Sequence, residues 1–148
     1  MPEEHRDAGL NAALVTAADC ASAAGAGAIL VVPTDLAFLS EPDLRAAAAA
    51  IPASPGCLIV PDRRNTGTNL LGLRPVKSEL FAFGDASLQQ HARQAGQLGY
   101  KVRIHSCAEL SLDLDLPEDY VAWHAELGKG APYGPLAENK RKILATGS

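Results

Sequence analysis

Two short, wholly apolar runs that each end at a proline constrain the fold more than any other feature. Residues 28–32 read AILVV and stop at Pro33, and residues 57–60 read CLIV and stop at Pro61. In such runs the side chains on both faces of the strand would be apolar, which is typical of strands covered on both faces. The chain therefore predicts a sheet buried between helices.

Helical patterns alternate with these runs. An Ala-rich helix is predicted over residues 10–24, and Ser40 is a suitable N-cap for a helix that extends to residue 50. Alternating strands and helices favour an α/β fold whose sheet is mainly parallel, with helices on both faces. The remaining predicted elements are a strand at 69–73, a helix at 86–98 capped by Asp85 and closed by Gly99, a strand at 101–105, and a helix at 117–127 opened by Pro117.

Length and charge exclude several classes of protein. The chain has 148 residues and a net charge of -4, which fits one domain and argues against a nucleic-acid surface. No apolar run is long enough to span a membrane, and the first residues are unlike a signal peptide. We expect a partial domain at 1–127, followed by a Gly/Pro-rich linker and basic tail at 128–148. Three cysteines without CxxC spacing indicate reduced thiols in a cytoplasmic protein.

Carboxylates follow the apolar runs. Asp35 lies just beyond the first run, and Asp113 and Asp115 lie in LSLDLDLPEDY. Open α/β sheets bind ligands beyond the carboxyl ends of their strands, and carboxylate oxygens suit Mg²⁺. Alternatively, Asp35 is a turn residue that caps backbone amides, and the other two occupy an exposed edge-strand face. Spacing alone does not decide between these readings.

A second set of residues suits an anion. The segment PDRRNTGTN at 61–69 offers hydroxyls and unhindered backbone N–H groups, and Arg63 and Arg64 suit phosphate oxygens. Gly84 and Ser87 flank the start of a predicted helix, where anions bind readily. The alternatives are a turn with solvated arginines and an ordinary helix cap.

The histidines predict neither zinc binding nor nucleophilic catalysis. The four histidines show no ligand spacing, and His91 and His124 are expected at surface or boundary positions of helices. Metal-assisted transfer of a nucleotidyl group fits the carboxylates and the anion-binding turn better.

Five segments together resemble the CofC/FbiD family. They are GLNAAL, VVPTDLAFL, VPDRRNTGTNLLGLRP, FAFGDASLQQHARQA and LDLDLPEDY, in that order, between Gly9 and about Trp123. That family comprises guanylyltransferases that act on 2-phospho-L-lactate or phosphoenolpyruvate in the biosynthesis of the deazaflavin coenzyme F-420. The resemblance implies the MobA-like nucleotide-diphospho-sugar transferase fold.

The resemblance also implies roles for single residues. Asp35, Asp113 and Asp115 would be the catalytic residues that bind Mg²⁺, and Asn11 would contact the nucleotide. The phosphate of the phospho-acid would attack the α-phosphorus of GTP and release pyrophosphate, without a covalent enzyme intermediate.

The small phospho-acid has its own implied contacts. By the same resemblance, Thr68, Gly84 and Ser87 would hold its phosphate and carboxylate. Arg63 and Arg64 are added from their own chemistry as phosphate contacts. The sequence does not distinguish phosphoenolpyruvate, 2-phospholactate and 3-phosphoglycerate.

Two departures from the family matter. Ala86 stands where members often have glycine, so a positive φ there would strain the backbone. The family's first βαβ unit, with its GTP-binding loop, has no counterpart in this sequence, which reads as N-terminally truncated. We therefore expect a homo-oligomer or a partner chain that completes the sheet.

Three hypotheses follow. The first is a guanylyltransferase that uses GTP, Mg²⁺ and a phospho-acid. The second is a truncated, non-catalytic member that serves as a metal or phospho-acid binding or oligomerising module. The third is another nucleotidyltransferase of the superfamily, such as a molybdopterin cofactor type, against which the TGTN and FGDAS segments speak.

Overall fold

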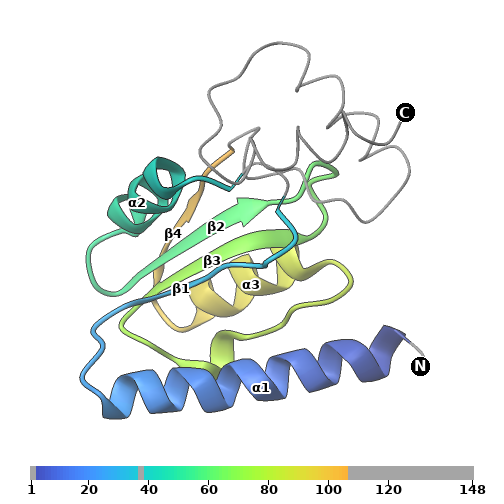
Figure 1. Ribbon diagram of the computed structural model, residues 1–148, viewed down its shortest axis with the longest axis horizontal. Coiled ribbons are helices and arrows are strands. Elements are labelled where there is room, and N and C mark those ends of the chain that lie inside the picture. Colours follow the sequence, from blue (N-terminus) through green and yellow to red (C-terminus); the bar gives the residue numbers. More distant parts are fainter. Residues whose placement is uncertain (1–2, 37–38, 107–148) are drawn as a thin grey trace, which may run out of the picture.

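The computed structural model of the protein describes residues 3–36 and 39–106 (Figure 1). Helices and strands alternate along most of this part of the chain. The elements are α1 (Glu3–Ala23), β1 (Ile29–Val31), α2 (Glu41–Ala50), β2 (Gly56–Pro61), β3 (Thr68–Arg74), a 3-10 turn η1 (Ser78–Leu80), α3 (Ser87–Gln97) and β4 (Lys101–Ile104).

The four described strands form one mixed sheet in the order β1-β3-β2-β4. β2 and β4 are parallel, whereas β3 runs antiparallel to both β1 and β2. The prediction of a mainly parallel sheet is therefore wrong. The cause is the connection at residues 62–67, because a parallel crossover needs about a dozen residues or more and this loop allows only a hairpin.

Side chains of β2 alternate between two apolar cores. Cys57 and Ile59 face a cluster that includes residues of α1 and α3, while Leu58 and Val60 face a cluster built on α2. Figure 1 shows α2 on one side of the sheet and α1 and α3 on the other. Helices on both faces are thus confirmed, and β2 is buried along its whole length.

The helix ends follow local chemistry, with one exception. Ser40 is the N-cap of α2, as predicted, and its Oγ accepts from the Asp43 N–H at 3.3 Å. Gly99 ends α3 at φ 79, also as predicted. The predicted cap of α3 by Asp85 is wrong, because the N-cap residue is Ala86 and it makes no side-chain cap bond.

One further boundary matters for the site. α1 begins seven residues earlier than the predicted start at residue 10, at Glu3, which brings its first turns alongside the Phe83–Gly84 segment. Among the described residues, no helix combines the length and apolar character needed to cross a membrane.

Candidate active site

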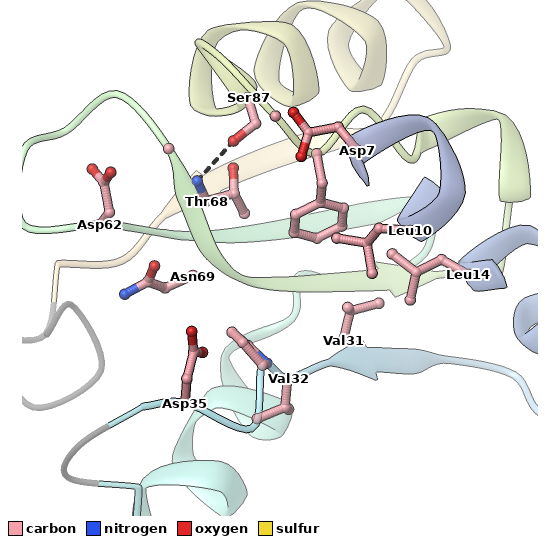
Figure 2. A pocket seen from close by; sticks show the side chains of 14 residues that line it. Asp7, Leu10, Leu14, Val31, Val32, Asp35, Asp62, Thr68, Asn69 and Ser87 are labelled. Carbon is pink, nitrogen blue, oxygen red and sulfur yellow. Dashed lines mark hydrogen bonds between the residues drawn. The ribbon is translucent and has the colours of Figure 1, made fainter. Parts of the chain in front are cut away.

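A pocket of about 340 Å³ opens where β1 and β2 end and β3 begins (Figure 2). Four parts of the fold contribute to it: the start of α1, the segment after β1, the β2–β3 hairpin and the turn before α3. Its lining residues are Asp7, Leu10, Leu14, Val31, Val32, Pro33, Asp35, Asp62, Gly67, Thr68, Asn69, Phe83, Gly84 and Ser87. The pocket lies at the carboxyl ends of two strands, which is where ligands bind in open α/β sheets.

Asp62 holds the hairpin loop in shape. Its Oδ1 accepts from the Thr66 N–H at 3.0 Å, and its own N–H donates to the Gly67 carbonyl at 3.1 Å. A Cβ at Gly67 would lie 2.8 Å from the Asp62 carboxylate, so a larger residue would not fit without a shift. Asn65 takes the left-handed conformation at φ 56, which asparagine tolerates well. The segment predicted to bind an anion is thus a closely held hairpin turn.

The hairpin is joined to the first turn of α3. The Thr68 N–H donates to Ser87 Oγ at 2.9 Å, and the Leu88 N–H donates to the Thr66 carbonyl at 3.1 Å. Figure 2 shows the first of these bonds at the pocket wall. Because Ser87 and Thr68 are both buried, this contact fixes two of the predicted phospho-acid contacts relative to each other.

Gly84 has a conformation and surroundings that favour glycine. Its φ is 134, and a Cβ there would lie 2.7 Å from Asp7 Oδ2. Asn11 supports the same segment, since its amide nitrogen donates to the Phe83 carbonyl and its amide oxygen accepts from the Phe83 N–H, both at 2.9 Å. The side-chain amide of Asn11 is therefore engaged with backbone, and its contact with a nucleotide stays a prediction.

His91 is the residue that sequence reasoning misplaced. The prediction of a surface or boundary position is wrong, because His91 is 1% exposed. Its Nε2 accepts from the Ala82 N–H at 3.0 Å, and its Nδ1 lies 2.8 Å from Thr68 Oγ1. Burial lowers the pKa of His91 to about 4, so the ring is neutral near pH 7. His91 lies at helical spacing from Ser87 and Ala95, and only the structure shows that all three are buried.

The structure brings some predicted site residues together and leaves others apart. Thr68, Gly84, Ser87 and Asp35 line one pocket. Arg63 and Arg64 lie on the hairpin loop, are exposed and do not line it. Asp113 and Asp115 lie outside the described residues, so their position relative to Asp35 stays a prediction.

The charges of the pocket wall are all negative within the described part of the chain. Asp7, Asp35 and Asp62 contribute carboxylates, and none of the described Lys or Arg residues lines the pocket. Asp7 was not anticipated from the sequence as a pocket residue, because its contact partners lie far along the chain. Within residues 3–36 and 39–106, no three His, Cys, Asp or Glu side chains gather closely enough to hold a metal ion.

Comparison with known proteins shows which proteins the chain is similar to. Residues 2–127 match the family described as "Guanylyl transferase CofC like". The chain is 37% identical over 127 residues to a phosphoenolpyruvate guanylyltransferase of Rubrobacter xylanophilus, covering 86% of this chain and 61% of that protein. It is 36% identical over 122 residues to the phosphoenolpyruvate guanylyltransferase of Sphaerobacter thermophilus, covering 81% of this chain and 58% of that one.

A relative with a different named substrate has a similar sequence identity. The 3-phospho-D-glycerate guanylyltransferase of Phenylobacterium zucineum is 37% identical over 122 residues, covering 80% of this chain and 54% of that protein. The chain thus spans little more than half the length of these curated relatives. Their names share guanylyl transfer and differ in the phospho-acid.

Proposed function

This chain belongs to the CofC-like guanylyl transferase family, and from that membership we propose that it joins GMP from GTP to a small phospho-acid. The phospho-acid is phosphoenolpyruvate, 2-phospholactate or 3-phosphoglycerate, and the product serves the biosynthesis of coenzyme F-420. The observation that carries this proposal is the gathering of Thr68, Gly84 and Ser87 with Asp35 in one pocket. Those are the residues for which the family resemblance implies phospho-acid and metal contacts.

The phospho-acid contacts follow from the polar groups of the pocket. Ser87 Oγ already accepts a hydrogen bond from the Thr68 N–H, so its hydroxyl hydrogen can serve a ligand oxygen. Gly84 has no side chain, so a ligand can approach its backbone closely. Arg63 and Arg64, on the hairpin loop that joins β2 to β3, are proposed as further phosphate contacts.

The acidic wall supports a requirement for Mg²⁺. An anionic substrate beside Asp7, Asp35 and Asp62 is repelled unless a cation lies between them. The exposed carboxylate of Asp35 offers a hard oxygen ligand of the type that Mg²⁺ prefers. We propose Asp113 and Asp115 as the remaining ligands. When bound, the metal would neutralise charge on the phosphates.

The proposed reaction is a single displacement. A phosphate oxygen of the phospho-acid forms a bond to the α-phosphorus of GTP, and the bond to the bridging oxygen of the leaving pyrophosphate breaks. The hydroxyl and backbone groups of the pocket hold the acid in place for attack, so that the protein contributes orientation and no nucleophile of its own. Asn11 is the proposed nucleotide contact.

The wider setting is also a proposal. We place the chain in the MobA-like fold, with residues 1–127 as its domain and residues 128–148 as a linker and tail; the family match over 2–127 supports that boundary. In the described sheet, β1 pairs only with β3 and β4 only with β2, so either edge offers backbone groups to a second copy or a partner chain. Free Cys20 and Cys57 support a cytoplasmic location, and we propose no nucleic-acid or membrane partner.

Pyrophosphate release tests the proposal. The purified chain is supplied with GTP, Mg²⁺ and each of the three phospho-acids in turn. We expect release with one acid and a loss of about a hundredfold or more in Asp35→Asn. Asp19→Asn removes an exposed carboxylate of α1 that does not line the pocket, so it should keep full activity.

Two outcomes would contradict the proposal. One is a folded chain that turns over none of the three acids, which would favour the non-catalytic alternative. The other is equal activity of Asp35→Asn and the unchanged protein, which would remove Asp35 from the site.

A further inference from the structure

We propose that His91 is a positioning residue that fixes the hydroxyl of Thr68 as a hydrogen-bond donor to the phospho-acid. The inference rests on the proposed function and extends it to a residue that does not line the pocket. It depends on the direction of two hydrogen bonds.

The first bond sets the tautomer of the ring. A backbone N–H can only donate, so the 3.0 Å contact from the Ala82 N–H requires a lone pair on His91 Nε2. In a neutral imidazole the other nitrogen then carries the hydrogen. Burial keeps His91 neutral near pH 7 by lowering its pKa to about 4. His91 therefore carries its hydrogen on Nδ1.

The second bond sets the polarity of Thr68. With the hydrogen on Nδ1, the 2.8 Å contact runs from His91 to Thr68, and Oγ1 is the acceptor. The hydroxyl hydrogen of Thr68 is then left for another acceptor. Thr68 lines the pocket, so a phosphate or carboxylate oxygen placed there meets a donor.

The neighbouring hydroxyl is arranged in the same way. Ser87 Oγ accepts from the Thr68 N–H at 2.9 Å, so its hydrogen is also free of that bond. Two buried hydroxyls, Thr68 and Ser87, thus have an acceptor site filled by the protein and present hydrogens toward an oxygen-rich ligand. In a wall whose described charges are all negative, such donors select where an anion can sit.

His91 is held firmly enough to do this. It is 1% exposed, both ring nitrogens are engaged, and the Phe83 ring meets it edge-on with centroids 4.8 Å apart. Reversal of the tautomer would set two N–H groups against each other at the part-buried Ala82 contact and lose that hydrogen bond. The polarity of Thr68 is therefore built into the fold.

The first experiment measures the tautomer without any ligand. Long-range proton–nitrogen NMR correlations on the full chain should show a protonated Nδ1 and a bare Nε2 for His91. The opposite pattern would overturn the inference whether or not the protein binds a phospho-acid.

The second experiment compares two substitutions. His91→Gln extends far enough to accept from the Ala82 N–H but provides nothing at the position of Nδ1. His91→Asn places an amide N–H near the position of Nδ1 and gives up the bond to Ala82. With phosphoenolpyruvate, 2-phospholactate and 3-phosphoglycerate as probes, we expect His91→Gln to weaken binding of the preferred acid about tenfold. His91→Asn should retain most of the affinity, and the KM for GTP should not change in either variant.

Thr68 supplies the cross-check. Thr68→Val should weaken phospho-acid binding by the same factor, whereas Thr68→Ser, which keeps the hydroxyl, should bind the acid like the unchanged chain. In the Thr68→Val background, His91→Gln should cause no further loss of affinity. Equal losses in His91→Gln and His91→Asn, or additive losses with Thr68→Val, would mean that His91 only fills space and would overturn the inference. Absence of binding to any acid in the unchanged, folded chain would refute the proposed function and the ligand part of this inference. The NMR measurement of the tautomer would still test the hydrogen bond between His91 and Thr68.

Discussion

Ala86 holds a backbone conformation that glycine would hold at lower cost. It lies at φ 54 and ψ 30, directly before α3, and makes no side-chain cap bond. The left-handed conformation costs a residue with a Cβ about 1–2 kcal/mol. Glycine avoids that cost but loses about 0.5–1 kcal/mol more in conformational entropy on folding. Ala86→Gly should therefore raise the free energy of unfolding by about 0.5–1 kcal/mol.

The assay is urea unfolding followed by far-UV circular dichroism, with thermal unfolding as a second measure. For a chain of this size the expected gain corresponds to about 1–4 °C in the unfolding midpoint. The slope of the free energy against urea should not change, because the substitution alters no buried surface.

Gly99→Ala is the matched control. Gly99 is also left-handed, at φ 79, and a Cβ there would meet no heavy atom within 4 Å. The substitution therefore adds conformational cost without a clash and should lower stability by about 1 kcal/mol. If Ala86→Gly fails to stabilise the protein while Gly99→Ala destabilises it, Ala86 is not strained and the reasoning is refuted.

Two further predictions concern buried titratable groups. Since burial lowers the pKa of His91 from 6.5 to about 4, the neutral ring stabilises the fold above pH 6.5, and this contribution is lost as the pH falls toward 4. Urea unfolding should show about 2 kcal/mol less stability at pH 5 than at pH 7, with a smaller difference in His91→Gln; an unchanged difference would assign the loss to other groups. Burial raises the pKa of the Cys57 thiol to about 12, so in Cys107→Ser a thiol reagent should label exposed Cys20 quickly and Cys57 only on unfolding. Rapid labelling of both would contradict the buried position of Cys57.

The sequence predicted the elements better than their directions. The apolar run at 57–60 became β2, the run at 69–73 became β3, and Ser40 and Gly99 ended helices as expected. An apolar run does not indicate whether a strand is parallel or antiparallel to its neighbours, because a strand buried on both faces is apolar in either orientation. The length of the 62–67 loop did indicate the direction of β3, because a loop this short can join only antiparallel strands.

Sequence reasoning anticipated local features of the pocket and missed those that depend on long-range contacts. The sequence raised the condition that a positive φ at Ala86 would strain the backbone, and the structure has φ 54 there. His91 was misplaced because a histidine on a helix gives no sign of partners such as Thr68, twenty-three positions away. Asp7 was missed for the same reason, since its approach to Gly84 depends on how α1 packs.

The contrast between the charges and the donors of the pocket indicates how its ligand is recognised. Arg63 and Arg64, the proposed phosphate contacts, do not line the pocket, and the described charges of its wall are the carboxylates of Asp7, Asp35 and Asp62. The hydroxyls of Thr68 and Ser87 add direction but almost no charge, so they cannot by themselves offset the repulsion of a phosphate. Under the proposed function, a phospho-acid is therefore held at this wall together with a cation. The metal provides attraction, to which Arg63 and Arg64 add from the hairpin loop, and the hydroxyls provide orientation. Binding of the phospho-acid without Mg²⁺ should therefore be weak even in a chain whose hydroxyls are intact. The hydroxyls orient the ligand but do not offset its repulsion by the carboxylates.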